Sequence, residues 1–185
     1  MGLRAQAVAP GAWGSTPWFV RQSLTCFGLG YLPASGTWGS IPPCAMALLL
    51  GSVGTSTAVT TACVVLCGLW GAVACLRFGD AGERAAGRKD PGIVVADEVA
   101  GMALMLIWLP PAPAAILGVD LPWWAPIAAA FFLFRVLDVA KLPPVHAVQS
   151  LPGGVGILVD DLLAAAQGWI LLQVGLRWLL PTLAA

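Results

Sequence analysis

The sequence predicts an all-α fold, a polytopic bundle of membrane helices with about four to five apolar helices and an N-terminal interfacial helix. Of the 185 residues, 59% are hydrophobic and only 10% are charged. Soluble domains carry about 25% charged residues, so this composition indicates a chain that lies in lipid. The mean hydropathy of +0.87 agrees with this. Strands are not expected, because the open edge of a sheet cannot be hydrogen-bonded within a bilayer.

The chain is expected to form one domain after a short flexible segment. Residues 1–17 are rich in Ala, Gly and Pro and should be flexible, and residues 18–185 should form a single membrane-embedded domain. The formal net charge is zero, so no broad basic surface is available to bind nucleic acid. The expected partner is the lipid bilayer, and the sequence leaves the oligomeric state open.

The expected helices follow the apolar runs of the sequence. Residues 18–27 have the pattern of a short amphipathic helix at the membrane interface, and a polar loop at 28–43 follows. Further apolar runs lie at 44–53, 56–76, 99–118, 123–137 and 161–180. The run 44–53 is short for a span of about 20 residues, so spanning and re-entrant arrangements both stay open. Prolines interrupt the run 99–118, whose helix should end near Leu109.

The order of these runs predicts which polar segments share a side of the membrane. If each run crosses, or dips and returns, in turn, then residues 28–43, 77–98 and 138–160 lie on one face. The basic residues of that face are Arg77, Arg84, Arg88, Lys89 and Lys141. By the positive-inside bias, this face is cytoplasmic.

Two pairs of adjacent carboxylates at the ends of apolar runs are candidate metal ligands. Asp97 and Glu98 precede one run, and Asp160 and Asp161 open the last. Adjacent carboxylates repel each other and lose hydration when buried, and a divalent cation would relieve both costs. One acidic residue in a first helical turn can simply complement the helix dipole, but two at the edge of a membrane helix favour a functional site. Oxygen ligands of this kind suit Mg²⁺.

Three charged residues follow at helical spacing near the end of another run. Arg135, Asp138 and Lys141 are three residues apart and lie roughly on one helix face. A structural interpretation is a ladder of salt bridges between positions i and i+3. In the functional interpretation, Arg135 and Lys141 bind phosphate oxygens while Asp138 orients them or binds the metal.

Two glycine-rich segments, at 28–40 and 153–156, could bring the backbone close to an anionic ligand. Their candidate phosphate-binding residues are Gly36, Thr37, Ser40, Gly153 and Gly154. Each segment can equally be a turn with a helix cap and no ligand. The single histidine, His146, lies in a polar loop, where it is either solvated or an acid–base group.

In their order and spacing, these motifs resemble the bacterial phosphatidylglycerophosphatase A family. The matching blocks are Gly30…Pro33-Ala34-Ser35-Gly36-Thr37-Trp38-Gly39-Ser40, Asp90…Val94-Val95-Ala96-Asp97-Glu98-Val99-Ala100-Gly101, Phe134-Arg135…Asp138…Lys141…Pro144 and Gly153-Gly154-Val155-Gly156-Ile157…Asp160-Asp161. The chain departs from the family pattern at Lys89 (where His is expected), at Ser35 (Pro) and at Leu142-Pro143 (Pro-Trp). These departures bear on substrate preference and leave the acidic positions intact.

The resemblance implies a phosphoric monoester hydrolase of the bacterial cytoplasmic (inner) membrane, multi-pass, with its active site facing the cytoplasm. The implied reaction is Mg²⁺-dependent removal of the terminal phosphate of phosphatidylglycerophosphate, which gives phosphatidylglycerol and inorganic phosphate in phospholipid biosynthesis. The family's acidic motif positions fall on Asp97, Glu98, Asp160 and Asp161, its basic helix on Arg135, Asp138 and Lys141, and its first loop on Thr37 and Ser40.

The expected roles follow from these positions. The candidate metal ligands are Asp97, Glu98, Asp160, Asp161 and Asp138, and the candidate catalytic residues are Asp161, Glu98 and Asp97. The alternative function is a small membrane transporter or a cation-conducting bundle that uses the same carboxylates. Its acids should lie at mid-membrane depth, whereas these cluster at the ends of segments.

Overall fold

The structure is a computed structural model that describes residues 13–110, 115–116, 119–143, 151–180 and 182. Its helices are α1 (Trp18–Leu24), α2 (Ser35–Ser52), α3 (Thr57–Ala86), α4 (Ala96–Met105), α5 (Ala125–Ala140) and α7 (Gly153–Val174). A 3₁₀ turn, η1 (Leu29–Tyr31), precedes α2, and a π-helical turn, η2 (Gly175–Leu179), follows α7. The described residues thus confirm the all-α class. His146 and the expected flexibility of residues 1–12 lie outside the described part of the chain.

A short antiparallel pair in the α4–α5 connection was not predicted. β1 (Ala115–Ile116) pairs with β2 (Val119–Asp120), and each strand has two residues. A pair this short adds no sheet to the fold. The prediction that strands are absent is therefore wrong only for this connection within the described residues.

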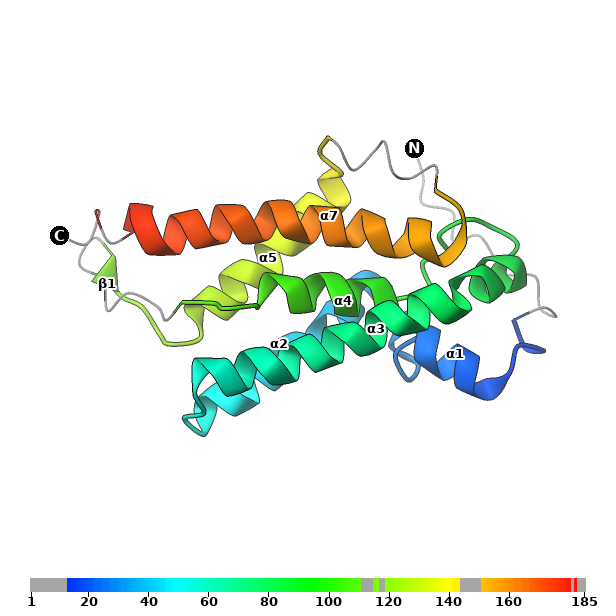
Figure 1. Cartoon of the computed structure of the whole chain (residues 1–185), viewed down its shortest axis with the longest axis horizontal. Helices are drawn as coiled ribbons and strands as arrows, with labels where there is room; N and C mark the ends of the chain where they lie inside the picture. The colour runs from blue at the N-terminus through cyan, green and yellow to red at the C-terminus, as the bar shows by residue number, and fades with distance from the viewer. Residues whose placement is uncertain (1–12, 111–114, 117–118, 144–150, 181, 183–185) are drawn as a thin grey trace.

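The short helix α4 lies at the centre of the bundle. It lies between α3 and α7 in the view of Figure 1, and it also contacts α2 and α5. Eight of its ten residues are buried, and Val99, Met102 and Met105 are completely buried. A helix that is apolar all round is typical of such a buried position.

Glycines allow the backbones around α4 to approach closely. A Cβ on Gly71 of α3 would lie 2.4 Å from the carbonyl oxygen of Ala96, and one on Gly68 would lie 2.6 Å from the Cβ of Ala103. On the other side, a Cβ on Gly101 would lie 2.7 Å from the ring of Phe134 in α5. Small residues at helix crossings are typical of membrane bundles, where close van der Waals packing drives association.

The C-terminal end of α4 is capped by side chains of α7 and η2. The carbonyl oxygen of Ile107 accepts a hydrogen bond from Trp169 Nε1 at 2.9 Å, and that of Trp108 accepts one from Arg177 Nη2 at 3.0 Å. Gln173 Nε2 donates to both carbonyls, at 3.2 and 3.1 Å. A buried carbonyl without a partner is costly, so these contacts let α4 end inside the bundle. The helix α4 ends at Met105, before the predicted end at Leu109, and Trp108 adopts a φ of +54°, which a right-handed helix cannot contain.

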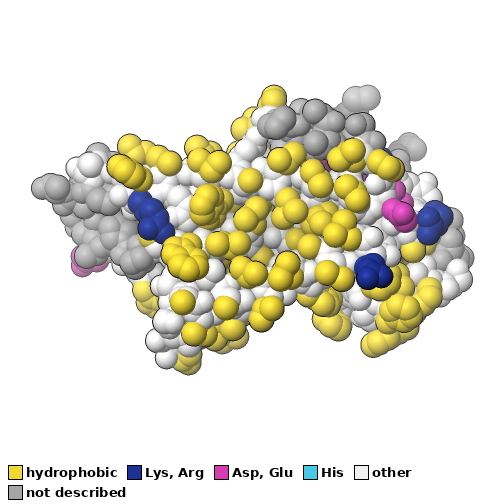
Figure 2. All heavy atoms as spheres, viewed as in Figure 1, with side chains coloured by type: hydrophobic (Ala, Val, Ile, Leu, Met, Phe, Trp, Pro, Cys, Tyr) yellow, Lys and Arg dark blue, Asp and Glu magenta, His cyan; other side chains and the backbone are white. Residues whose placement is uncertain are grey.

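Two of the described helices are long and apolar enough to cross a membrane. They are Thr57–Ala86 and Gly153–Leu179, whose most apolar windows have mean hydropathies of 2.1 and 1.6. Apolar side chains cover the middle of the face seen in Figure 2, and charged side chains lie toward its two ends. α5 has 16 residues and is about 24 Å long, less than the roughly 30 Å of a bilayer core. The expected count of four to five apolar helices therefore stays a prediction.

The helix α2 begins earlier than predicted. It starts at Ser35, so the expected loop at 28–43 is wrong over its last nine residues, 35–43. Pro42 and Pro43 lie inside this helix, although proline normally disfavours a helix interior. Close packing of α2 offsets the cost of these prolines. Gly39 lies so near Val95 that a Cβ on it would be 2.8 Å from the Val95 side chain.

The helices α3 and α7 also extend beyond their predicted ranges. α3 continues through the polar residues to Ala86 and ends at Gly87, which adopts the left-handed conformation common after a helix end. α7 begins at Gly153, so the segment expected to be a flexible glycine loop forms its first turns. Contacts with α3, described below, fix this start.

Candidate active site

Three carboxylates from two helices meet inside the bundle. Asp97 and Glu98 belong to the first turn of α4, and Asp161 comes from α7. One oxygen from each of the three lies within 4.8 Å of the others. Asp97 is 4% exposed and Asp161 is 5% exposed. We call this group the acidic trio. Residues 63 positions apart therefore lie in one cluster, which contains three of the five predicted metal ligands.

The acidic trio has unused hydrogen-bonding capacity. Asp97 Oδ1, Glu98 Oε2 and Asp161 Oδ2 are buried and have no hydrogen-bond partner among the described residues. Buried polar atoms without partners are rare because each one costs free energy. A divalent cation would satisfy all three, and a donor set made only of carboxylate oxygens suits a hard cation such as Mg²⁺ rather than zinc. The trio can thus hold a metal.

Burial keeps the carboxyl groups of α4 from ionising readily. It raises the pKa of Asp97 well above its usual value, and the neighbouring charge of Glu98 adds to this. Burial also raises the pKa of Glu98 to about 8, to which the charges of Asp161 and Asp138 contribute. Without a cation the site therefore retains protons near neutral pH, and a bound cation would displace them.

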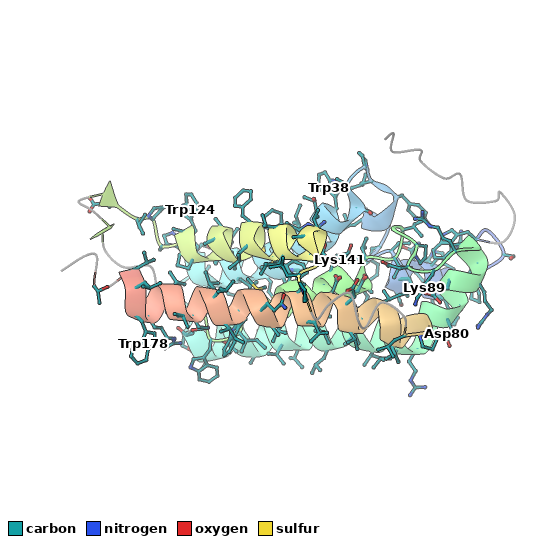
Figure 3. The ribbon with its side chains drawn as sticks, turned by 90° about the horizontal axis from the view of Figure 1, so that it is seen from above. Trp38, Asp80, Lys89, Trp124, Lys141 and Trp178 are labelled. Atoms are coloured by element: carbon teal, nitrogen blue, oxygen red, sulfur yellow. The ribbon has the colours of Figure 1, made fainter. Side chains whose placement is uncertain are left out.

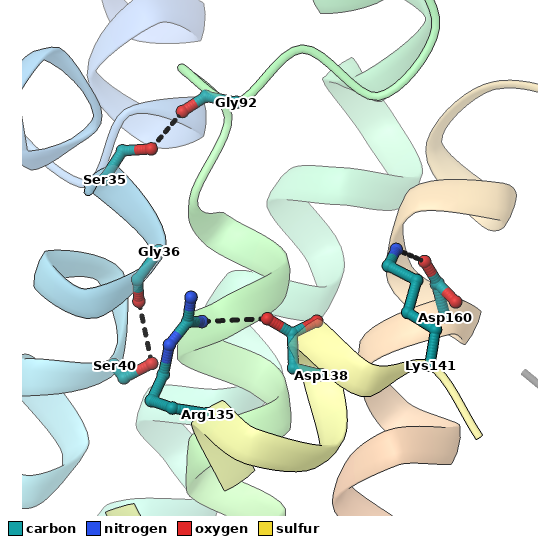
Figure 4. Close-up of polar contacts among 8 residues, drawn as sticks. All are labelled: Ser35, Gly36, Ser40, Gly92, Arg135, Asp138, Lys141 and Asp160. Carbon is teal, nitrogen blue, oxygen red and sulfur yellow. Dashed lines mark hydrogen bonds and ion pairs between the residues drawn. The ribbon is translucent and has the colours of Figure 1, made fainter. Parts of the chain in front are cut away.

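A guanidinium borders the acidic trio. Arg135 Nη1 forms an ion pair with Asp138 Oδ2 at 3.0 Å along α5 (Figure 4). A Cβ on Gly36 of α2 would lie 2.5 Å from Glu98 Oε1 and 2.8 Å from both terminal nitrogens of Arg135. Gly36 therefore leaves the space in which the guanidinium and the Glu98 carboxylate approach each other. An arginine in this place can bind phosphate oxygens in a bidentate manner.

A second basic residue reaches α7. Lys141, at the C-terminal end of α5, forms an ion pair with Asp160 Oδ2 (Figure 4). The backbone φ of Lys141 is +46°, an uncommon conformation for a residue other than glycine. A hollow of about 230 Å³ lies beside this pair, lined by Lys89, Asp90, Gly156 and Asp160. In this structure Asp160 thus orients a lysine and is not a member of the acidic trio.

The residues predicted in the first loop lie in the first turns of α2, whose Gly36 and Gly39 border Glu98. Ser40 is completely buried, and its hydroxyl donates to the carbonyl oxygen of Gly36 at 2.8 Å. Thr37 is half-buried in the first turn of α2. A role for Thr37 and Ser40 in binding phosphate stays a prediction.

The glycines at the start of α7 contact α3. The N–H of Gly154 donates to Asp80 Oδ1 at 2.9 Å. A Cβ on Gly154 would lie 1.9 Å from the carbonyl oxygen of Cys75, and one on Gly153 would overlap the Asp80 carboxylate. Sequence reasoning missed Asp80. Its place among the charged residues at the end of an apolar run gave no sign of which helix it would cap.

Comparison with known proteins places the chain in a family. A helical bundle with long apolar helices and a buried carboxylate group beside an arginine fits the class of membrane-associated hydrolases of phosphate esters. Residues 23–176 match the sequence model of the family Phosphatidylglycerophosphatase A. The chain belongs to the phosphatidylglycerophosphatase A family of phosphoric monoester hydrolases.

Three relatives illustrate the match. A protein of Bacteroides thetaiotaomicron named "Putative phosphatidylinositol-3-phosphatase" is 33% identical over 84% of this chain and 92% of its own length. Phosphatidylglycerophosphatase A of Haemophilus influenzae is 32% identical over 83% of this chain and 86% of its own. Phosphatidylglycerophosphatase A of Escherichia coli is 34% identical over 53% of this chain and 52% of its own. No solved structure matches the chain.

Proposed function

We propose that this protein is a Mg²⁺-dependent lipid phosphatase that hydrolyses the terminal monoester of phosphatidylglycerophosphate to phosphatidylglycerol and inorganic phosphate. The observation that carries this proposal is the acidic trio beside Arg135: one oxygen from each carboxylate lies within 4.8 Å of the others, and each carboxylate has a buried oxygen without a hydrogen-bond partner among the described residues. The family and the names of two relatives support the choice of substrate.

The proposed mechanism assigns a role to each part of the site. Asp97, Glu98 and Asp161 would hold the cation, which when bound neutralises phosphate charge and polarises a water molecule. Arg135 binds oxygens of the phosphoryl group and stabilises the charge that develops on them. One carboxylate of the trio, Glu98 or Asp161, accepts the proton of the attacking water.

The remaining charged residues position the basic groups. Asp138 holds the guanidinium of Arg135 through the ion pair on α5. Asp160 holds the Lys141 ammonium beside the hollow that Asp160 lines, and there the ammonium can neutralise phosphate charge. We therefore propose Asp138 and Asp160 as residues that orient the two cations, in place of the predicted role as metal ligands.

The proposed setting is the cytoplasmic membrane, crossed several times by a single domain of residues 18–185, with the site facing the cytoplasm. In Figure 3, Asp80 and Lys89 lie toward one end of the bundle and Trp124 and Trp178 toward the other, with Lys141 nearer the first end. Tryptophans are enriched at membrane interfaces, and basic residues on the cytoplasmic side. This distribution supports the proposed orientation.

Phosphate release from the purified full-length protein in detergent tests the function. The substrates are phosphatidylglycerophosphate, phosphatidylinositol 3-phosphate, phosphatidic acid and glycerol 3-phosphate, each with Mg²⁺ or with EDTA. We expect release from the first, and its loss in EDTA. A transporter or channel would release none, and faster release from the inositol lipid would favour the activity in the name of the Bacteroides relative.

Matched variants test the site. Asp161→Asn removes one carboxylate charge from the trio, and Asp120→Asn makes the same change at an exposed residue of β2. We expect Asp161→Asn to lose at least about a hundredfold in rate, and Asp120→Asn to keep the wild-type rate. A wild-type rate for Asp161→Asn would end the proposal.

A further inference from the structure

An apolar groove runs between α2 and α5. It has a volume of about 390 Å³ and is lined by Cys44 and Leu48 of α2 and by Ile127, Ala128 and Phe131 of α5, among others. Trp124 lies at its end near the start of α5, and Phe132 is exposed on its rim. We call it the α2–α5 groove. Its lining has no charged side chain.

Both helices that form the walls of the α2–α5 groove continue from it to the candidate active site. On α5, Arg135 follows Phe131 by four residues, which is one helical turn or about 6 Å. On α2, Ser40 and Gly36 precede Cys44 by one and two turns. The side chains of Glu98 and Arg135 both lie next to Gly36. The apolar walls therefore lead directly to the guanidinium that borders the acidic trio.

We propose that the α2–α5 groove binds an acyl chain of the lipid substrate while the phosphate of the same molecule reaches Arg135. The proposal rests on the proposed phosphatase function. A lipid phosphate ester combines an apolar chain with an anionic group, and this groove combines apolar walls with a cation one turn beyond them. No other occupant would use both features, because a bulk hydrocarbon chain or a second protein helix has no need of the arginine.

Two neighbouring alanines of α5 give a matched test. Ala128 is half-buried and lines the groove, and Ala129 is exposed on the next position of the helix. Ala128→Phe fills the groove, and Ala129→Phe adds the same ring outside it. Phosphate release is measured on two phosphatidylglycerophosphates with the same headgroup, one with eighteen-carbon chains and one with four-carbon chains.

We expect Ala128→Phe to lower kcat/KM for the long-chain lipid by about tenfold or more, because apolar sites discriminate groups of this size by that factor. Its rate on the short-chain lipid should stay within about twofold of wild type, which also shows that the variant is folded. Ala129→Phe should leave both rates unchanged.

Several results would overturn the proposal. Ala128→Phe could lower kcat/KM equally on both lipids or on neither, or it could change the oligomeric state. Ala129→Phe could also lower kcat/KM for the long-chain lipid as much as Ala128→Phe does. If Ala128→Phe does not fold, the milder Ala128→Leu and cross-linking by a lipid with a photoreactive chain end replace it. Cross-links on residues 127–132 would support the groove, and cross-links confined to α3 would refute it. A wild-type protein inactive on both lipids would instead refute the phosphatase function, and this inference with it.

Discussion

Without the proposed Mg²⁺, the stability of this protein should depend on pH in the direction opposite to that of most carboxylate-bearing proteins. The pKa of Glu98 is raised by burial from its ordinary value of 4.5 to about 8. A group whose pKa is higher in the folded state stabilises the fold fully below its unfolded pKa and loses that contribution as the pH rises through the folded pKa. The metal-free protein should therefore become less stable between about pH 4.5 and pH 8.

The size of this effect follows from the two pKa values. Each pH unit between them lowers the free energy of unfolding by about 1.4 kcal/mol. Relative to acidic pH, Glu98 alone should therefore lower the free energy of unfolding by about 3 kcal/mol at pH 7 and by about 5 kcal/mol above pH 9. This is a large part of the roughly 5–15 kcal/mol that stabilises a typical domain. Mg²⁺ should reverse the trend, because it binds the ionised carboxylates and stabilises the folded state more strongly as the pH rises.

The assay is thermal unfolding of the purified protein in detergent at pH 5, 7 and 9, with EDTA or with excess Mg²⁺. The unfolding midpoint in EDTA should fall as the pH rises, and Mg²⁺ should restore it most at pH 9. Glu98→Gln cannot ionise, so its midpoint in EDTA should depend less on pH and respond less to Mg²⁺. A wild-type midpoint in EDTA that is as high at pH 9 as at pH 5 would refute this reasoning.

Three further predictions concern named contacts. Arg135→Ala should lower kcat/KM for phosphate release by about a hundredfold or more, and Arg135→Lys by less; equal losses would contradict a role for the positive charge. Gly154→Ala should lower the free energy of unfolding by about 2 kcal/mol or more, because its Cβ would lie 1.9 Å from the Cys75 carbonyl oxygen. Gly175→Ala, whose Cβ would have no neighbour within 4 Å, should not lower it. Asp80→Ala should lower the free energy of unfolding by about 1 kcal/mol, because it removes the carboxylate that accepts a hydrogen bond from the N–H of Gly154. Asp80→Asn keeps an acceptor oxygen and should lower it less. Equal decreases in the two variants, measured by thermal unfolding, would contradict this role.

The helical class could be predicted, and so could the approach of Asp97 to Asp161, because they depend on local features of the sequence and on the order of its apolar runs. Two adjacent carboxylates that are buried at the edge of a membrane helix are costly unless they are paired, protonated or bound to a ligand. The order of the runs brings Asp97 and Asp161 to the same end of the bundle, and their oxygens lie within 4.8 Å. The central place of α4 was not predictable in this way, since a run of ten helical residues resembles any short apolar segment.

The starts of α2 and α7 depend on contacts between distant segments, so the sequence alone could not define them. Glycines at 36, 39, 153 and 154 predict loops by local propensity, yet each lies in a helix where a neighbouring element comes too close for a side chain. The early start of α7 also explains why Asp160 pairs with Lys141. Asp160 and Asp161 both lie in this helix, where successive side chains point about 100° apart. Only Asp161 therefore faces Asp97 and Glu98.

The helix α7 and the π-helical turn after it hold both ends of α4. Asp161 meets the first turn of α4 at the acidic trio, while Gln173 and Arg177 bind the carbonyl groups that follow its last turn. Asp161 and Gln173 are twelve residues apart, about 18 Å along one rigid helix. The separation between the trio and the capped end of α4 is therefore fixed by helix geometry rather than by loops. A site built in this way can keep its carboxylates close together before a metal binds, despite their mutual repulsion.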